Sequence, residues 1–162
     1  MMETGTTIGN RERWKENADK ARYHFKIADH IAYTTITLLK DNRLMIKILN
    51  ETAESVSFII SALLQREYAL GKVKLYKDSE LNRKTFVDKI APRYIDKNDI
   101  ENIVKTLEIK KKHLEAPVEF VRKDKFVILL GDKYEVLTLE TLKEIMASAR
   151  KLIMRACNEI GC

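Results

Sequence analysis

"LMIKILNETAESVSFIISALLQREYAL", residues 44–70, is the stretch that decides the fold. Apolar residues recur in it at alternating steps of four and three, which is the spacing of one face of an α-helix. Phe58 and Ile60 widen that face, so we expect this helix to pack on more than one side. Gly71 follows it, and glycine accepts the left-handed conformation in which many helices end. The alternating positions are Met45, Leu49, Thr52, Val56, Ile59 and Leu63.

The sequence upstream of this helix predicts a second long helix, over about residues 10–39. Its repeating positions are mostly small residues, which would let a partner helix approach closely. Only "KDNR" (40–43) separates the two helices, and so short a break makes them antiparallel neighbours. Residues 1–9 are predicted to be a disordered tail. The repeating positions are Trp14, Ala18, Ala21, Phe25, Ala28, Ala32, Thr35 and Leu39.

Three further helices are predicted downstream, at about residues 80–90, 97–115 and 139–157. Pro92 ends the first of them, and each begins after a residue type that caps helices. The prediction is an all-α fold: a bundle of four to five helices with two long antiparallel N-terminal helices, forming a single domain over residues 10–162. The candidate caps are Asp78 or Ser79, Asp96 or Asn98, and Thr138.

One β-hairpin is predicted before the last helix. "KFVILL" (125–130) and "KYEVLT" (133–138) flank Gly131–Asp132, a two-residue loop suited to a primed turn. The preceding "EFVRKDK" (119–125) fits either one helical turn or an extended arm. Because an isolated hairpin is marginal in water and an uncovered apolar edge aggregates, we expect either the bundle or a second chain to cover it. A homodimer is therefore predicted.

Composition indicates the kind of surface and the cellular compartment to expect. Its 162 residues carry a net charge of +6, but 24 acidic residues are spread among the basic ones. That balance fits a mixed-charge solvated surface or a phosphate-facing patch. The N-terminus lacks the apolar core of a signal peptide, and the longest strongly apolar stretch (55–64) is about half a membrane span. We expect a cytoplasmic, non-membrane protein in which Cys157 and Cys162 are reduced thiols.

No catalytic constellation is complete in the sequence. The five glycines form no phosphate loop, and neither His-x-x-x-His nor Cys-x-x-Cys occurs, so no catalytic residue, metal or cofactor is predicted. A single Gln, Gln65, among many Lys, Glu and Ile resembles the composition of heat-adapted proteins.

Two groups of residues are candidates for binding RNA. The first is a cation cluster that a fold-back at Pro117 would bring together, with a salt-bridged surface as the alternative. The second is a helix face of aromatic and basic residues, which suits base stacking and phosphate binding or, alternatively, a covering helix or subunit. The cluster comprises Lys110, Lys111, Lys112, Arg122, Lys123 and Lys125, and the face comprises Tyr23, Lys26, His30 and Tyr33.

The stretches "ADHIAYTTITLLKD" (28–41), "SALLQREYALGKVKLYKD" (61–78) and "PVEFVRKDKFVI" (117–128) resemble a family of uncharacterised archaeal proteins. That family is similar to the HEPN superfamily (higher eukaryotes and prokaryotes nucleotide-binding), and the similarity to HEPN rests on the long antiparallel helix pair. The first resemblance covers most of residues 18–155.

The resemblance implies a bundle of about four helices, often dimeric. HEPN ribonucleases place a His four to six residues after an Arg, whereas here Arg22 precedes His24 by one intervening residue and His30 by seven. The nuclease motif is absent, so the resemblance implies a non-catalytic interaction module that binds RNA or a protein partner. The alternatives are an atypical metal-independent ribonuclease using His30, and a purely structural oligomer.

Overall fold

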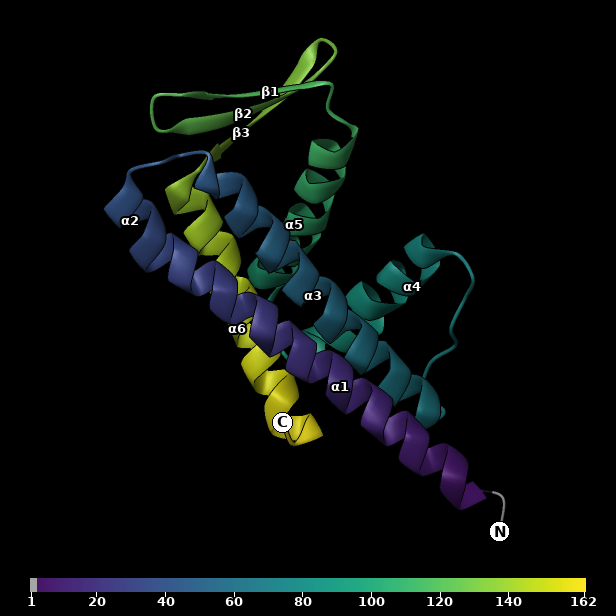
Figure 1. Cartoon of the computed structure of the whole chain (residues 1–162). Coiled ribbons are helices and arrows are strands. Elements are labelled where there is room, and N and C mark those ends of the chain that lie inside the picture. The colour runs from purple at the N-terminus through teal and green to yellow at the C-terminus, as the bar shows by residue number, and fades with distance from the viewer. Residues whose placement is uncertain (1–2) are drawn as a thin grey trace.

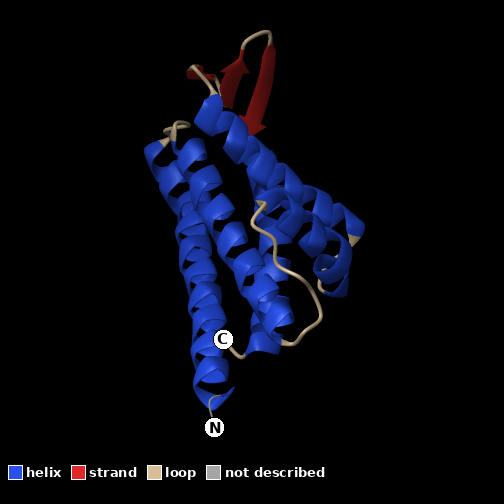
Figure 2. Cartoon of the chain, turned by 90° about the vertical axis from the view of Figure 1, so that its right-hand side faces the viewer, coloured by secondary structure: helices blue, strands red, loops and turns tan. Residues whose placement is uncertain are grey.

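A helical bundle carries a small antiparallel sheet across one end (Figures 1 and 2). The computed structural model describes the backbone of residues 3–162 and the side chains of residue 9 and residues 12–162. In chain order the elements are α1 (Glu3–His30), a π-helical turn (Ile31–Thr35), α2 (Ile36–Leu39), α3 (Leu44–Ala69), α4 (Ser79–Thr85), a second π-helical turn (Phe86–Ile90), a 3₁₀ turn (Ala91–Arg93), α5 (Lys97–Glu115), β1 (Val118–Arg122), β2 (Lys125–Leu130), β3 (Lys133–Thr138) and α6 (Leu139–Ile160).

The first two long helices lie side by side, as the sequence predicts. α1, the π-helical turn and α2 form one continuous rod, and α3 returns along it (Figure 1). Ala18, Ala21 and Ala28 of the rod are fully buried, and these small side chains let α3 approach closely. Lys40 adopts the left-handed conformation (φ 50°) that ends α2 and begins the reversal.

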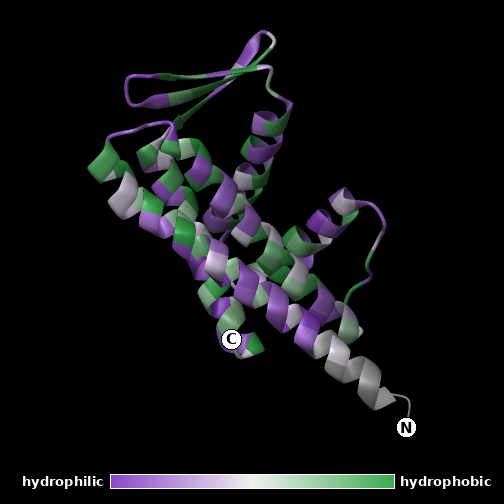
Figure 3. Ribbon diagram, in the orientation of Figure 1, coloured by the Kyte–Doolittle hydropathy of each residue, from purple (hydrophilic) through white to green (hydrophobic). Residues whose placement is uncertain are grey.

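Helix α3 is the centre of the core. It contacts α1, α5 and α6, which confirms the expectation that it is packed on more than one side. Ile59 and Leu63 have no exposed surface, and Leu142 and Leu152 of α6 are equally buried. In Figure 3, which colours each residue by hydropathy, the strands of the sheet are mostly hydrophobic and its turns are hydrophilic.

Helix capping agrees with the sequence at most ends. Asp78, Asp96 and Thr138 each accept a hydrogen bond from a backbone amide in the first turn of the helix that follows. The last helix continues to Ile160, three residues beyond the predicted end, and Gly161 (φ 89°) ends it in the left-handed conformation.

The mainly helical class is confirmed, and the predicted strands 125–130 and 133–138 pair as β2 and β3, but the sheet has a third strand that the single-hairpin prediction lacks. Residues 118–122, left open between helix and extended arm, form β1 and pair antiparallel with β2. The sheet therefore has three strands in the order β1-β2-β3. Pro117 ends the helical stretch, and pairing with β2 then satisfies the backbone groups of 118–122 that a helix would otherwise satisfy.

Helix α1 extends into the stretch predicted as an N-terminal tail. Helix α1 begins at Glu3, so residues 3–9 are helical rather than disordered, while residues 1 and 2 lie outside the described part. Once a helix has nucleated, each added residue gains a hydrogen bond, and no proline before residue 10 stops the extension.

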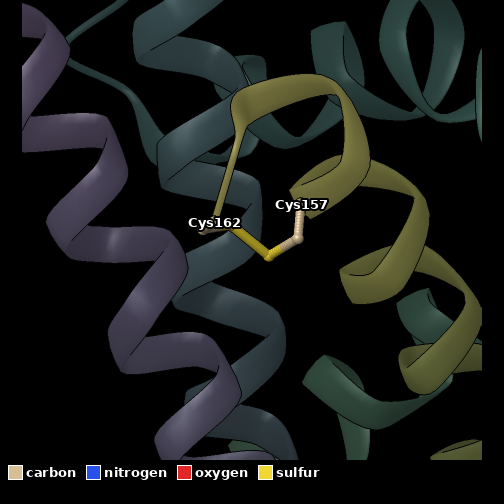
Figure 4. The surroundings of a disulfide bond; sticks show 2 residues. All are labelled: Cys157 and Cys162. Atoms are coloured by element: carbon tan, nitrogen blue, oxygen red, sulfur yellow. A yellow bond between two sulfur atoms is a disulfide. The ribbon is translucent and has the colours of Figure 1, made fainter.

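The two cysteines are paired instead of being free thiols. Cys157, in the last turn of α6, forms a disulfide with Cys162, and their Cα atoms are 4.8 Å apart (Figure 4). The left-handed Gly161 reverses the chain and brings Cys162 back to the helix. The spacing of five residues matches no familiar motif, which is why sequence reasoning missed the pairing.

Candidate functional site

The three strands present two faces of different character. Side chains alternate between the faces, and the register aligns equivalent positions across the sheet. Phe126, Ile128 and Leu137 share the inner face, turned toward the helices, with exposed fractions of 6%, 0% and 0%. The inner face is therefore part of the hydrophobic core.

Two carboxylates flank Ile128 on this inner face, and both are paired with the end of α5. Lys112 Nζ lies 3.3 Å from Glu135 Oε2, and His113 Nδ1 is hydrogen-bonded to Glu119 Oε1. The last turn of α5 is thus attached to the sheet by polar contacts.

The predicted six-cation cluster is split by this arrangement. Lys112 pairs with the inner face, and Lys110 Nζ donates to Asn50 Oδ1 of α3 at 2.6 Å. Strand β1 then carries Arg122 about 13 Å along the sheet from Val118, since each extended residue advances about 3.3 Å. Pro117 therefore does not fold one half of the cluster onto the other.

The outer face of the sheet, turned away from the helices, is mostly apolar; Val127 on the central strand is 9% exposed, whereas residues on the two edge strands are open. Val118, Phe120 and Tyr134 are 51%, 41% and 69% exposed. A shallow depression of about 540 Å³ lies over this face and over the β1–β2 turn. By register, the outer face consists of Val118, Phe120, Arg122, Lys125, Val127, Leu129, Tyr134, Val136 and Thr138.

The β1–β2 turn supplies positive charge at one end of the outer face. Arg122, Lys123 and Lys125 are exposed, and none forms an ion pair with the described side chains. Asp124 is the one carboxylate among them. The Asn42 amide donates a 2.8 Å hydrogen bond to the carbonyl oxygen of Lys123, which holds this basic turn against the loop between α2 and α3.

The second predicted group, on the N-terminal helix, is only partly brought together. Tyr23, Lys26 and His30 line a groove of about 520 Å³ beside the start of α3. Tyr33 instead lies beneath Lys143 of α6, whose Nζ is 4.4 Å from the ring centroid. The π-helical turn at Ile31–Thr35 is the reason, because its wider turn rotates the residues after His30 away from the 3.6-residue spacing.

His30 itself is exposed, and no described side chain is hydrogen-bonded to it. His24 is different: its Nδ1 lies 2.6 Å from Glu51 Oε2, and its ring stacks on Phe58 with centroids 5.5 Å apart. The orienting contacts that general acid–base chemistry needs are thus found at a packed histidine and not at the exposed one.

Sequence reasoning missed a charged cluster where α3, α6 and the turn before α5 meet. Arg93 bonds the carboxylate of Glu67, which is 3% exposed. Tyr94 donates to Glu159, and that hydrogen bond lowers the pKa of Glu159, while burial raises the pKa of Tyr94. The partners lie 26 and 65 residues apart, so no local pattern indicates them.

A second polar contact of this kind joins α5 to α6. Ser148 donates to Asp99 at 2.7 Å, and Lys151 Nζ lies 3.4 Å from the other carboxylate oxygen. Burial acts to raise the pKa of Asp99, but the bonds from Ser148 and Lys151 outweigh it and lower the pKa. Because the charges in both clusters find partners, we interpret the clusters as structural ties between helices.

Two classes of site find no support in the part of the chain that the structure describes. No group of three or more His, Cys, Asp or Glu side chains there is placed to hold a metal ion. Among the helices of residues 3–162, none is both long enough and apolar enough to cross a membrane.

In comparisons with known proteins, no family model, curated protein or solved structure matches the chain. The outer face of the sheet, with its basic turn, is the strongest candidate site in the described residues.

Proposed function

We propose that this chain is a non-catalytic, HEPN-like interaction module that binds single-stranded RNA on the outer face of the sheet. The observation that carries the proposal is the exposure of Phe120 and Tyr134 on one sheet face that ends in a turn of unpaired cations. The HEPN-like character is supported by the long antiparallel pair α1 and α3.

An open sheet face suits unpaired bases. Single-stranded nucleic acid is commonly held by aromatic side chains on which bases stack, at about 1–3 kcal/mol per base. Phe120 lies on the edge strand β1 and Tyr134 on the edge strand β3. Val127 and Leu129 of the central strand β2 lie between them on the same face. Phe120 is 41% and Tyr134 69% exposed, so each aromatic ring presents surface to a ligand.

The charge of the neighbouring turn favours a polyanion over an apolar protein segment. Arg122, Lys123 and Lys125 exceed the single Asp124 by two charges, on a chain whose net charge is +6. Phosphates bound there would release counterions, which makes the affinity fall with salt. The outer face carries few hydrogen-bonding groups, so the proposal includes weak dependence on base sequence.

The proposal places the protein in the cytoplasm of a heat-adapted archaeon. The Cys157–Cys162 disulfide is compatible with such a setting, because intracellular proteins of hyperthermophiles are rich in disulfides, whereas those of mesophiles seldom retain them.

The test is fluorescence anisotropy of a labelled single-stranded RNA, titrated with protein between low and physiological salt. Replacing Phe120 and Tyr134 by Ser should weaken binding at least about tenfold, because two stacking surfaces are lost. A matched control replaces Tyr68 and Tyr76, which are 57% and 45% exposed elsewhere on the chain, by Ser. The control should bind as the wild type does.

The same assay tests the basic turn. Changing Arg122, Lys123 and Lys125 together to Gln should flatten the log–log salt dependence by about 2, at about 0.7 per phosphate contact. The matched triple change of residues 110–112 to Gln removes equal charge, but Lys110 and Lys112 already have partners, so its effect should be smaller.

Three outcomes would contradict the proposal. Absence of binding at low salt, together with light scattering at twice the 18.9 kDa of one chain, would favour a second copy on the outer face. Absence of binding by a monomer would favour a different protein partner. Cleavage of the RNA in chelator, abolished by His30→Ala, would favour the ribonuclease alternative.

A further inference from the structure

A second hollow lies far from the sheet, between α1 and the C-terminal end of α6. Its volume is about 350 Å³, within the range of small-molecule sites. The Cys157–Cys162 bond forms part of its wall, and Figure 4 shows that bond at the end of α6, next to α1. We call this hollow the α1–α6 groove; its lining is Arg22, Phe25, Lys26, Asp29, Arg150, Ile153, Met154, Cys157, Asn158 and Cys162.

Among the side chains of the α1–α6 groove, the cations Arg22, Lys26 and Arg150 outnumber the carboxylates. Asp29 is its one carboxylate side chain, and Arg150 Nη2 already contacts Asp29 Oδ1 at 2.7 Å. The same guanidinium group lies over the ring of Phe25, 5.2 Å from its centroid, and is thereby fixed in place. Arg22 and Lys26, one helical turn apart on α1, are exposed and pair with no carboxylate among the described side chains.

The rest of the α1–α6 groove is mostly apolar. Phe25 and Ile153 are 8% and 4% exposed and form its floor, while Met154 is 60% exposed at its side. A thioether side chain adapts readily to ligands of irregular shape. Binding sites for small molecules combine an apolar lining with a few placed polar groups in this way.

We propose that the α1–α6 groove binds a small amphipathic organic anion, a carboxylate or sulfonate carried on an aromatic or aliphatic body. The anionic group lies between Arg22 and Lys26, and the apolar body lies along Phe25 and Met154. The disulfide closes the end of the groove. This site is separate from the outer face of the sheet, and it does not depend on RNA binding.

The test uses 8-anilinonaphthalene-1-sulfonate, whose fluorescence rises when it leaves water. The wild-type protein should bind it saturably, and decanoate should displace it. Changing Arg22 and Lys26 together to Gln should weaken binding at least tenfold. A matched control changes Lys77 and Lys89, two exposed lysines outside the groove, to Gln and should leave the affinity unchanged.

Two further titrations test whether the probe binds in the groove and whether its sulfonate group contributes to the affinity. The uncharged analogue N-phenyl-1-naphthylamine should bind wild type and the double Gln variant equally, because it lacks the anionic group. The Phe120→Ser, Tyr134→Ser variant should bind the sulfonate as wild type does.

Each of these measurements has a result that overturns the proposal. Lack of saturable sulfonate binding would do so, as would equal affinity in the wild type and the Arg22, Lys26 variant. Loss of binding in the sheet variant would place the probe on the outer face instead. Thermal unfolding followed by circular dichroism shows that each variant is folded before it is titrated.

Discussion

The two faces of the sheet are built by the same three strands and yet differ in almost every respect. On the inner face, Ile128 is completely buried and the carboxylates beside it are bonded to α5. On the outer face, Phe120 and Tyr134 are 41% and 69% exposed. The backbone hydrogen bonds are common to both faces, so the difference comes from what covers the side chains.

The two faces serve different purposes: buried side chains of the inner face stabilise the fold, and exposed side chains of the outer face are candidates for binding. Burial of apolar surface stabilises the fold, and each inner side chain contributes to it. On the outer face, Val118, Phe120 and Tyr134 keep 51%, 41% and 69% of their surface in water, so these side chains add less to stability and remain available to a ligand. A residue that stabilises little but is large, aromatic and exposed is a stronger candidate for binding than one in the core.

The largest expected effect tests the inner face against the outer one. Ile128→Ala should lower the free energy of unfolding by about 2–5 kcal/mol, because it leaves a cavity in a fully buried position. The matched outer change, Tyr134→Ala, should cost less than about 0.5 kcal/mol. Urea denaturation of both variants measures this, and equal losses would mean that the outer face is covered.

The next effect concerns the two turns that bracket β2. Lys123 has φ 57° and Gly131 has φ 63°, and both turns contain two residues. Lys123→Gly should stabilise the protein by about 0.5–1 kcal/mol. A residue with a Cβ atom costs about 1–2 kcal/mol in the left-handed conformation, and the greater conformational entropy of glycine in the unfolded chain offsets only part of that gain.

Gly131→Ala is the reverse substitution in the other turn: it adds a Cβ atom at a left-handed position. A Cβ there would meet no atom within 4 Å, so the change adds backbone strain without a clash. It should destabilise by about 1 kcal/mol. Thermal unfolding of both variants reports the shifts, and shifts of the same sign would refute the assignment of strain to backbone conformation.

The smallest effect concerns the polar part of the inner face. Glu135→Gln breaks the pair with Lys112, which is partly exposed, so we expect a loss of about 0.2–1 kcal/mol that shrinks in high salt. Asp124→Asn, in the exposed basic turn, is the control and should change stability by less. A larger loss at Asp124 than at Glu135 would show that the Asp124 carboxylate stabilises the fold more than the Glu135–Lys112 pair does.

Much of the helical framework could be predicted from the sequence. The α3 periodicity, the glycine after that helix and the short loop before it are local signals, and they correctly gave an antiparallel helix pair. Helix caps at Asp78 and Thr138 are likewise local, because a side chain bonds to an amide two or three residues away. The β2–β3 turn was recognised since Gly131 marks its left-handed position.

The candidate site could be predicted only in part. Arg122, Lys123 and Lys125 were selected from the sequence and lie together at the basic turn, but Phe120 and Tyr134 were not selected. Phe120 is assigned to a face only when β1 is recognised as a strand, and Tyr134, although on a predicted strand, is seen to be exposed only once the fold shows which face the helices cover. The turn Lys123–Asp124 lacks the glycine or asparagine that marks a primed turn, and Asp124 alone is a weaker turn signal, so the sequence leaves β1 open.

By itself, the sequence determined the features that depend on neighbours along the chain: helix periods, helix ends and one glycine turn. The tertiary structure alone decided which charges are paired and which surfaces are open. Lys110 and Lys111 are adjacent in sequence, yet Lys110 bonds Asn50 while Lys111 remains exposed. Pairing and burial are contacts between segments far apart in the chain, and their energies depend on distances that only the folded arrangement sets.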